Sequence, residues 1–441
     1  MMAAAVPFLS AAAQAKTVYV CTPCGLWCDS KLEFDKPGAC TNCGMPLIVK
    51  PPSAAGPLNS AHLPDGSSSV HFPFELLANA IFLPAEVNGQ GPVLFAVDTG
   101  SFNSVIASEF VEQLGIQTHG SGHATGAGSD SSPMSMIDNV DFRLPQGVVM
   151  STKLAASVSM AGLWPLIGRT VYGDLGHDVL QHFVVQIDYE NQLISLHDPQ
   201  TYIYTAHGTG FPAELWGQYD PQIPGEVVVP GQPPIPVKLT IDTGAGGTVL
   251  STALVNSQHI SAAVGKTIAM PDHGIGNGES MPQLARLETL RVGSYLVDAP
   301  LVALSQDKVG AFASETISVN IGGNILRRFT LILDYPNGRV ILEPNKHIHE
   351  PFASDASGLI LTAQGDDFRT FVVQDVLPDS PASEAGLIQG DVITAIDGHS
   401  VNRYALWQLQ DVFKDSGRTQ KVTIQRNQSF LTLTLALRAL L

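Results

Sequence analysis

Apolar and polar residues alternate in short runs along most of the chain, a pattern typical of half-buried β-strands rather than of long helices. Residues 80–98 and 226–242 show this alternation, and each run leads into the tripeptide Asp-Thr-Gly. Residues 421–437 alternate in the same way near the C-terminus. Gly (41) and Pro (30) are frequent and divide the runs by turns. The pattern predicts a mostly β protein.

An internal repeat organises the middle of the chain. Residues 95–100 read FAVDTG and residues 239–244 read LTIDTG, 144 positions later. Residues 175–183 read LGHDVLQHF and residues 321–329 read IGGNILRRF, 146 positions later, and a third block at 185–189 keeps this offset. Three blocks in the same order, with an offset that drifts by only two residues, predict a duplicated domain.

Changes in composition set the expected domain boundaries. Residues 51–69 are rich in Pro, Ala, Gly and Ser, which is typical of a linker. A second segment, beginning at 201, is rich in Pro, Gly and Tyr and is expected to connect the two repeats. The expected organisation is a signal peptide at 1–15, a Cys-rich segment at 17–49, a linker at 50–69, lobe 1 at 70–200, a connection at 201–224, lobe 2 at 225–346 and a C-terminal domain at 355–441.

Composition and charge exclude several classes of protein. Hydrophobic residues make up 44% of the chain and charged residues 14%, so the chain can bury several cores and is not disordered as a whole. The formal net charge of −17 has the wrong sign for a phosphate-binding surface, so nucleic acid is not an expected partner. No downstream run of 18 or more apolar residues predicts a transmembrane helix.

The first 15 residues, MMAAAVPFLSAAAQA, form an apolar run that ends in Ala13-Gln14-Ala15. This ending fits the small-x-small cleavage site of a secretory signal, although the usual positive charges are missing. The alternatives are a flexible Ala-rich N-terminus or a start codon that clips the signal. Export to the periplasm or the extracellular space is favoured over a cytoplasmic location.

All five cysteines lie between Cys21 and Cys43. Cys21 and Cys24 form one C-x2-C pair, and Cys40 and Cys43 form a second pair fifteen residues later, a spacing typical of zinc sites. Four thiolates on two tight turns can surround Zn²⁺ as a tetrahedron, so the segment predicts a structural zinc ribbon. Disulfides are the alternative in an oxidising compartment. Cys28 either enters the metal shell, stays free or is a small buried hydrophobe.

Residues 19–47 also resemble the small heavy-metal-binding ribbon found beside bacterial metal-handling proteins. The chain departs from that family at Pro23-Cys24, where the family usually carries Met-His. The resemblance supports metal binding by the segment and gives metal handling as one reading of the whole protein. That reading accounts for only about a tenth of the chain.

The duplicated Asp-Thr-Gly motifs predict the chemistry. Duplication allows the two loops to meet across a pseudo-two-fold axis, which brings Asp98 and Asp242 together. Two carboxyl groups at close range share one proton, because both cannot ionise. One can then act as the base that activates water and the other as the acid that protonates a peptide carbonyl oxygen. The glycines are expected to allow tight turns and the threonines to link the loops by hydrogen bonds: Thr99, Gly100, Thr243 and Gly244.

At these motifs, residues 70–345 resemble the retropepsin-like aspartic proteases, in a form with both lobes in one chain. The family pattern of apolar residues before Gly is matched at Leu175-Gly176 and Ile321-Gly322. The resemblance implies a peptide endopeptidase that is complete in a monomer and needs no cofactor for catalysis. It also places Gly-rich hairpin flaps at 120–128 and 273–278.

Residues 379–393, DSPASEAGLIQGDVI, closely resemble part of a PDZ domain of the bacterial protease-associated kind. PDZ domains bind a protein C-terminus as an added strand, and backbone N–H groups hold its carboxylate. The family match places this loop at Gly358, Leu359 and Ile360, which implies an apolar last residue in the ligand. The alternative is a domain that packs against the lobes and binds no peptide.

These features together favour an exported aspartic endopeptidase that acts on polypeptides through Asp98 and Asp242. The chain contains no G-x-S-x-G motif, which argues against serine hydrolase chemistry. The competing hypothesis is a non-catalytic scaffold, in which the lobes bind extended peptides and the other modules recruit partners.

Overall fold

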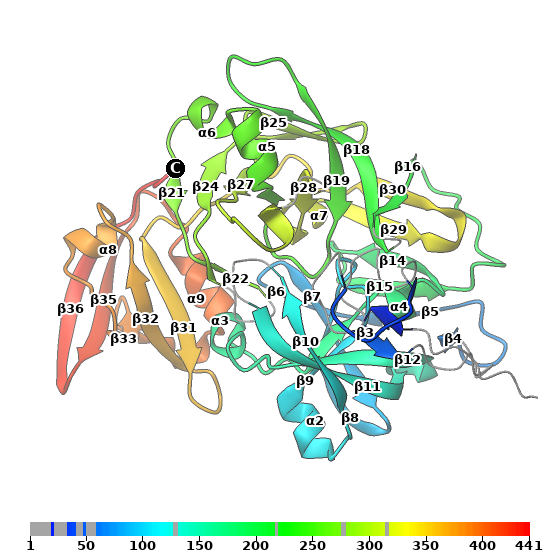
Figure 1. Cartoon of the computed structure of the whole chain (residues 1–441). Helices are drawn as coiled ribbons and strands as arrows, with labels where there is room; N and C mark the ends of the chain where they lie inside the picture. The colour runs from blue at the N-terminus through cyan, green and yellow to red at the C-terminus, as the bar shows by residue number, and fades with distance from the viewer. Residues whose placement is uncertain are drawn as a thin grey trace, which may run out of the picture. The chain divides into compact units, whose positions relative to one another are not determined.

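A computed structural model describes residues 19–21, 33–40, 47–49, 59–126, 131–216, 219–274, 279–313 and 317–441. The chain forms two compact units, Met1–Gly56 and Pro57–Leu441. Figure 1 traces the strands and short helices of both units, and β-structure dominates as the sequence predicted. Among the described residues, no helix is both long and apolar enough to cross a membrane.

The first unit contains a three-stranded antiparallel sheet with the strand order β2-β1-β3. Its strands are β1 (Tyr19–Cys21), β2 (Glu33–Phe34) and β3 (Leu47–Val49). Cys21 ends β1 opposite Leu47, and Cys40 is buried. Cys24, Cys28 and Cys43 lie outside the described residues. The tetrahedral zinc site therefore stays a prediction.

Lobe 1 is built on a nine-stranded sheet with the order β10-β11-β12-β9-β13-β8-β7-β6, in which β4 pairs with β12. The strands are β4 (Ser60–His62), β6 (Glu75–Leu77), β7 (Ala80–Val87), β8 (Gln90–Val97), β9 (Val105–Ala107), β10 (His119–Thr125), β11 (Ser131–Arg143), β12 (Val149–Val158) and β13 (Gly173–Leu175). Strand β4 falls within the segment expected to be linker, so part of that segment belongs to the lobe. The helices are α2 (Ser108–Leu114), η1 (Pro145–Gly147), α3 (Trp164–Ile167) and α4 (His177–Leu180).

Lobe 2 is built on a ten-stranded sheet with the order β21-β24-β27-β20-β28-β19-β18-β25-β26, in which β17 pairs with β18. The strands are β17 (Glu214–Trp216), β18 (Asp220–Val228), β19 (Ile235–Ile241), β20 (Val249–Leu250), β21 (Ile268–Ala269), β24 (Gln283–Arg286), β25 (Thr289–Val292), β26 (Tyr295–Asp298), β27 (Leu301–Leu304) and β28 (Val319–Ile321). Strands β22 (Asp272–His273) and β23 (Glu279–Ser280) form a separate pair. The helices are α5 (Thr252–Ser257), α6 (Ile260–Ala263), η2 (Ala311–Ala313) and α7 (Gly323–Leu326).

The two lobes repeat the same strand pairings. In lobe 1, β13 runs parallel to β8 and antiparallel to β9, which in turn runs parallel to β12. In lobe 2, β28 runs parallel to β19 and antiparallel to β20, which in turn runs parallel to β27. The internal repeat of the sequence is therefore a repeat of topology.

A six-stranded sheet joins the lobes in the order β16-β30-β29-β14-β15-β5. Its strands are β5 (Ser69–Pro73), β14 (Val184–Asp188), β15 (Leu193–His197), β16 (Thr209–Pro212), β29 (Phe329–Asp334) and β30 (Arg339–Pro344), and the turn η3 (Tyr335–Asn337) joins β29 to β30. At its centre Gln186 lies opposite Ile332, 146 positions later. The flanking pairs, Val185 with Leu333 and Ile187 with Leu331, are symmetric about this position, as expected of a local two-fold axis. Segment 201–224 contributes β16, β17 and the start of β18 rather than only a connection.

The second unit has separate cores for the lobes and for the C-terminal domain. One hydrophobic cluster extends through both lobes and their joining sheet, and a second lies within residues 356–437. In β5, Val70 and Phe72 are buried while their neighbours are exposed, as the alternation of the sequence predicts. Each core is thus formed by the apolar faces of its own strands.

The C-terminal domain is a six-stranded sheet with the order β31-β32-β33-β35-β36, in which β34 pairs with β33. Its elements are β31 (Leu359–Gln364), β32 (Thr370–Val376), α8 (Pro381–Glu384), β33 (Val392–Ile396), β34 (His399–Ser400), η4 (Val401–Arg403), α9 (Leu406–Val412), β35 (Thr419–Arg426) and β36 (Ser429–Ala436). Helix α8 begins at Pro381, where the Ser380 hydroxyl caps it by accepting a hydrogen bond from the Ser383 N–H. Gly386 follows the helix with a φ of 81°, as expected for a helix-ending glycine.

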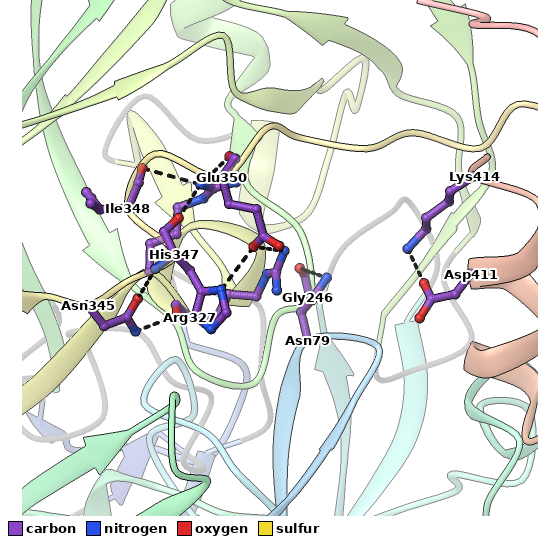
Figure 2. A network of polar contacts seen from close by, with 10 residues as sticks. Asn79, Gly246, Arg327, Asn345, His347, Ile348, Glu350, Asp411 and Lys414 are labelled. Carbon is purple, nitrogen blue, oxygen red and sulfur yellow. Dashed lines mark hydrogen bonds and ion pairs between the residues drawn. The ribbon is translucent and has the colours of Figure 1, made fainter. Parts of the chain in front are cut away.

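Arg328 fastens to the core the segment through which the chain leaves lobe 2. Figure 2 shows this segment at Asn345, His347, Ile348 and Glu350. The buried guanidinium donates hydrogen bonds to the carbonyl oxygens of His347 at 2.7 Å and Glu350 at 2.6 Å, and it lies over the ring of Phe352. Arg327 adds an ion pair with Glu350 at 3.2 Å. These contacts fix the start of the connection between lobe 2 and the C-terminal domain.

Candidate active site

The two Asp-Thr-Gly loops follow equivalent strands and are anchored in the same way. Asp98 comes directly after β8, and its N–H donates to the carbonyl oxygen of Leu175 at 3.0 Å. Asp242 comes directly after β19, and its N–H donates to the carbonyl oxygen of Ile321 at 3.1 Å. The apolar-Gly elements identified in the sequence therefore support the loops, as expected.

Four hydrogen bonds cross between the loops through two fully buried threonines. The Thr99 hydroxyl donates to the carbonyl oxygen of Ile241 and the Thr243 hydroxyl to that of Val97, both at 2.6 Å. Each hydroxyl also accepts a hydrogen bond from the other threonine's backbone N–H, at 3.1 and 3.2 Å. These hydrogen bonds link the two loops and fix the spacing of the two aspartates.

Replacing Thr99 with Val is expected to lower the free energy of unfolding by about 2 to 4 kcal/mol. The change removes one donor and one acceptor and leaves buried backbone groups without partners. Thr99→Ser keeps the hydroxyl and is the matched control. Urea unfolding followed by fluorescence measures both variants, and equal stability of the Val and Ser variants would contradict a role for these hydrogen bonds.

Each carboxyl group lies over the glycine of the opposite loop. A β-carbon on Gly244 would lie 2.3 Å from Cγ of Asp98, and one on Gly100 would lie 2.9 Å from Cγ of Asp242. Both distances are shorter than real carbon contacts, so any side chain at these positions must displace a carboxyl group. The requirement for glycine thus comes from the close approach of the two loops.

Gly244→Ala is expected to reduce peptide-cleaving activity by about 100-fold, because a shift of about 1 Å in a reacting group has an effect of this size. Gly100→Ala is expected to have a smaller effect, since its β-carbon has 0.6 Å more room, at 2.9 against 2.3 Å. Steady-state kcat/KM of the two folded variants gives the comparison. Equal activities of wild type and Gly244→Ala would contradict the placement of Asp98.

A turn of lobe 1 also holds the lobe 2 loop in place. The Asn79 side chain donates to the carbonyl oxygen of Gly246 at 3.3 Å (Figure 2). A β-carbon on Gly246 would lie 2.1 Å from the carbonyl oxygen of Ala78, so the turn approaches the loop closely. In the opposite direction, the ring of Tyr219 at the start of β18 contacts Phe102 beside the lobe 1 loop. The loops are therefore supported from both lobes.

The Asp98 and Asp242 carboxyl groups hydrogen-bond to one another and stay partly exposed. Burial raises the pKa of Asp98 well above its usual value, and the neighbouring carboxyls of Asp242 and Asp174 raise it further. The pair therefore holds a proton at pH values where an isolated aspartate is ionised.

The partners of the two aspartates differ. Asp242 accepts hydrogen bonds from the N–H groups of Gly244 at 3.0 Å and Ala245 at 2.9 Å, and from the side-chain amide of Asn320 at 2.7 Å. Asp98 accepts one from the Gly100 N–H at 2.8 Å. Asp242 therefore has three N–H donors where Asp98 has one.

Sequence reasoning missed two further carboxyl groups near the pair. Asp174 is buried, and burial raises its pKa to about 8. Asp220 is buried at the start of β18, and burial together with Asp242 raises its pKa well above the usual value. The repeat could have drawn attention to Asp174, because it aligns with Asn320. Asp220 lies in a segment that was expected to be a connection.

Both expected flaps correspond to hairpins in part. Residues 120–125 lie on β10, which pairs with β11. In lobe 2, β22 and β23 pair with each other. The intervening residues 127–130 and 275–278 lie outside the described residues, so the tips of the flaps stay predictions.

In the C-terminal domain, Gly358 comes directly before β31, and Leu359 and Ile360 are the first two residues of this strand. Gly358 has a φ of 80°, and a β-carbon there would lie 2.2 Å from Cβ of Ser380. The N–H groups of Ser357 and Gly358 donate to the carboxyl group of Asp355. A ligand carboxylate must therefore compete with Asp355 at this loop. Further along the strand, a β-carbon on Gly168 of lobe 1 would lie 3.6 Å from Cβ of Ala363.

Comparison with known families shows two domains. Residues 83–176, which contain Asp98 and the whole Asp-Thr-Gly strand and loop of lobe 1, match the aspartyl protease family. Residues 354–437 match the PDZ domain family. The chain thus contains an aspartyl protease domain and, toward its C-terminus, a PDZ domain.

Similar proteins match part of the chain, and the two curated relatives are named as serine proteases. Serine protease HTRA1 of Xenopus tropicalis is 25% identical over 232 residues, 51% of this chain and 46% of that protein. Its namesake in Xenopus laevis is 25% identical over 225 residues, 49% of this chain and 45% of that protein. The matches thus span under half of each relative. A solved photosystem II D1 C-terminal processing protease has 28% identity over 19% of this chain and 22% of its own, with a TM-score of 0.18.

Proposed function

We propose that the protein is an aspartic endopeptidase in which Asp98 and Asp242, one from each lobe, activate water to hydrolyse peptide bonds. The hydrogen bond between two partly exposed carboxyl groups, on loops linked through Thr99 and Thr243, carries this proposal. The family match of lobe 1 to aspartyl proteases supports it, and the repeated topology supplies the second aspartate.

The different hydrogen-bond partners of the two aspartates support a role for each. Asp242, with three N–H partners, is the ionised member and takes a proton from the attacking water. Asp98 is the protonated member and donates to the peptide carbonyl oxygen as the tetrahedral intermediate forms. The proton taken up by Asp242 then goes to the leaving amine as the C–N bond breaks, and Asp98 regains its proton from a hydroxyl group of the intermediate. No covalent intermediate forms.

The PDZ domain gives the proposed enzyme a means to recruit substrates or partners. PDZ domains bind chain ends along a sheet edge, and β31 is an edge strand in the described sheet. We propose that Gly358, Leu359 and Ile360 receive an apolar C-terminus. The first unit is proposed to bind one structural Zn²⁺ through Cys21, Cys24, Cys40 and Cys43.

An inhibition experiment tests the proposed class directly. The full chain is incubated with an unfolded test protein, with and without a statine-containing peptide, a sulfonyl fluoride and a chelator. Inhibition by the statine peptide alone is expected, because its hydroxyl mimics the tetrahedral intermediate between the two carboxyls. Inhibition by the sulfonyl fluoride would instead indicate serine chemistry. Binding of the statine peptide without any cleavage would indicate a peptide-binding scaffold.

A further inference from the structure

The two lobes differ at one equivalent position beside the aspartates. In lobe 1, Asp174 on β13 lies opposite Ala96 of the strand that leads to Asp98. In lobe 2, Asn320 on β28 lies opposite Thr240 of the strand that leads to Asp242. Asp174 and Asn320 are 146 positions apart, the offset of the surrounding repeat. The repeat therefore places an amide beside one aspartate and a carboxyl group beside the other.

Asp174 is enclosed without a counter-charge. The residue is only 1% exposed, and the donors near its carboxyl group are the Ser101 hydroxyl and the Val105 N–H. The groups that face it are the carboxyls of Asp98, Asp178 and Asp242, together with the Ser101 hydroxyl and the Val105 N–H. Within the described residues, no Lys, Arg or His forms an ion pair with it. A buried carboxyl group in such a setting is costly when ionised.

We propose that Asp174 is a positioning residue that keeps the shared proton on Asp98 and so leaves Asp242 as the carboxylate that activates water. This role rests on the proposed protease function. Both aspartates have other carboxyl groups nearby, Asp174 among them and, for Asp242, Asp220 as well. Asp242, however, can ionise with the Asn320 amide and two backbone N–H groups as donors, whereas Asp98 has one N–H donor. The proton therefore stays in lobe 1.

The same arrangement extends the pH range of the protonated pair. Burial is the main cause that raises the pKa of Asp174, to about 8. As Asp174 ionises with rising pH, its charge repels a second charge on Asp98 and delays the loss of that proton. Without the third carboxyl group, Asp98 would lose its proton at lower pH.

Asp174→Asn tests this role because it makes the lobe 1 position identical to that of lobe 2. The alkaline limb of the kcat/KM profile is expected to move to lower pH by about one unit or more, since one unit corresponds to about 1.4 kcal/mol. A purely structural role would lower activity equally at all pH values. An unchanged alkaline limb in a folded, active Asp174→Asn variant would overturn the proposal.

Exchanging the two residues gives a stricter test. Asn320→Asp alone places a carboxyl group beside Asp242 and is expected to move the acidic limb to higher pH. The double variant Asp174→Asn with Asn320→Asp restores one amide and one carboxyl group with the lobes reversed. The double variant is expected to be more active than Asn320→Asp alone. If the loss of kcat/KM in the double variant is the sum, in free energy, of the losses in the two single variants, the proposal is contradicted.

A titration without substrate separates this inference from the protease function. The full chain is labelled with ¹³C at the aspartate carboxyl carbons, and the ¹³C chemical shifts are followed from about pH 3 to 9. This range covers the titration of both ordinary and buried carboxyl groups. Asp174→Asn is expected to remove one high-pH titration and to lower the pH of another, which Asp98→Asn identifies. Asp141→Asn, an exposed site, is the control. If Asp174→Asn leaves the second titration unmoved, the inference fails even when the wild type cleaves peptides. If the titrations behave as expected and no substrate is cleaved, only the protease proposal fails.

Discussion

Replacing either Asp98 or Asp242 with Asn is expected to lower kcat/KM for an unfolded protein substrate by at least ~1000-fold. Each change removes one partner of the hydrogen-bonded pair, so the site can no longer provide both a base and an acid. The two losses should not add in the double variant, because the carboxyls act as one unit. Cleavage of a quenched fluorescent peptide measures the rates.

The controls for this experiment separate chemistry from folding. Asp141→Asn changes an exposed carboxyl group of β11 and is expected to keep wild-type activity. Urea unfolding of all variants shows whether the loops stay linked through Thr99 and Thr243. Asp→Asn variants that fold and retain full activity would contradict a catalytic pair at these residues.

The stability of the protein is expected to fall as pH rises from about 6.5 to 8. Burial raises the pKa of Asp174 to about 8 and the pKa values of Asp98 and Asp220 well above the usual range, so the folded chain binds more protons than the unfolded chain. Stability therefore decreases with pH, by up to ~1.4 kcal/mol per unit for each such group. Two such carboxyl groups would lower the free energy of unfolding by about 3 kcal/mol over one pH unit.

The lower end of this pH window is set by a buried histidine. Burial lowers the pKa of His177 to about 4, so the folded chain keeps this group neutral while the unfolded chain protonates it below its ordinary pKa of about 6.5. Below about pH 6.5 this histidine makes the stability rise with pH, which opposes the fall in stability caused by the buried carboxyl groups. Above it, only the carboxyls contribute to the slope.

Urea unfolding at about pH 6.5, 7.25 and 8 measures how the free energy of unfolding changes with pH across this window. Asp174→Asn should give a shallower decline than wild type, and Asp141→Asn should give the wild-type decline. A stability that is flat or rises across this window in the wild type would show that these carboxyl groups are not protonated in the folded chain.

The sequence was sufficient for the features that recur within it. The repeat identified both aspartates, the threonines that link their loops and the apolar-Gly elements beneath them. The Pro381 start of α8 and the glycine after it were also predictable, because each depends on local backbone preferences. Such features need only a few neighbouring residues or a comparison of the chain with itself.

Other features depend on pairing between distant strands. Asp174 and Asn320 reach the aspartates through the parallel pairing of β13 with β8 and of β28 with β19. Segment 201–224 had the composition of a connection, but sheet pairing makes three strands of it. Register and side-chain direction decide these contacts.

The absence of a covalent intermediate is the most direct test of the central claim, and intact-mass spectrometry of the enzyme during turnover measures it. The reaction with an unfolded protein or a peptide ester is quenched with acid within the first turnovers. If Asp98 and Asp242 activate water, the mass of the enzyme stays that of the unmodified chain while products accumulate. An enzyme mass increased by the acyl part of the substrate would show a nucleophilic side chain and contradict the aspartic mechanism.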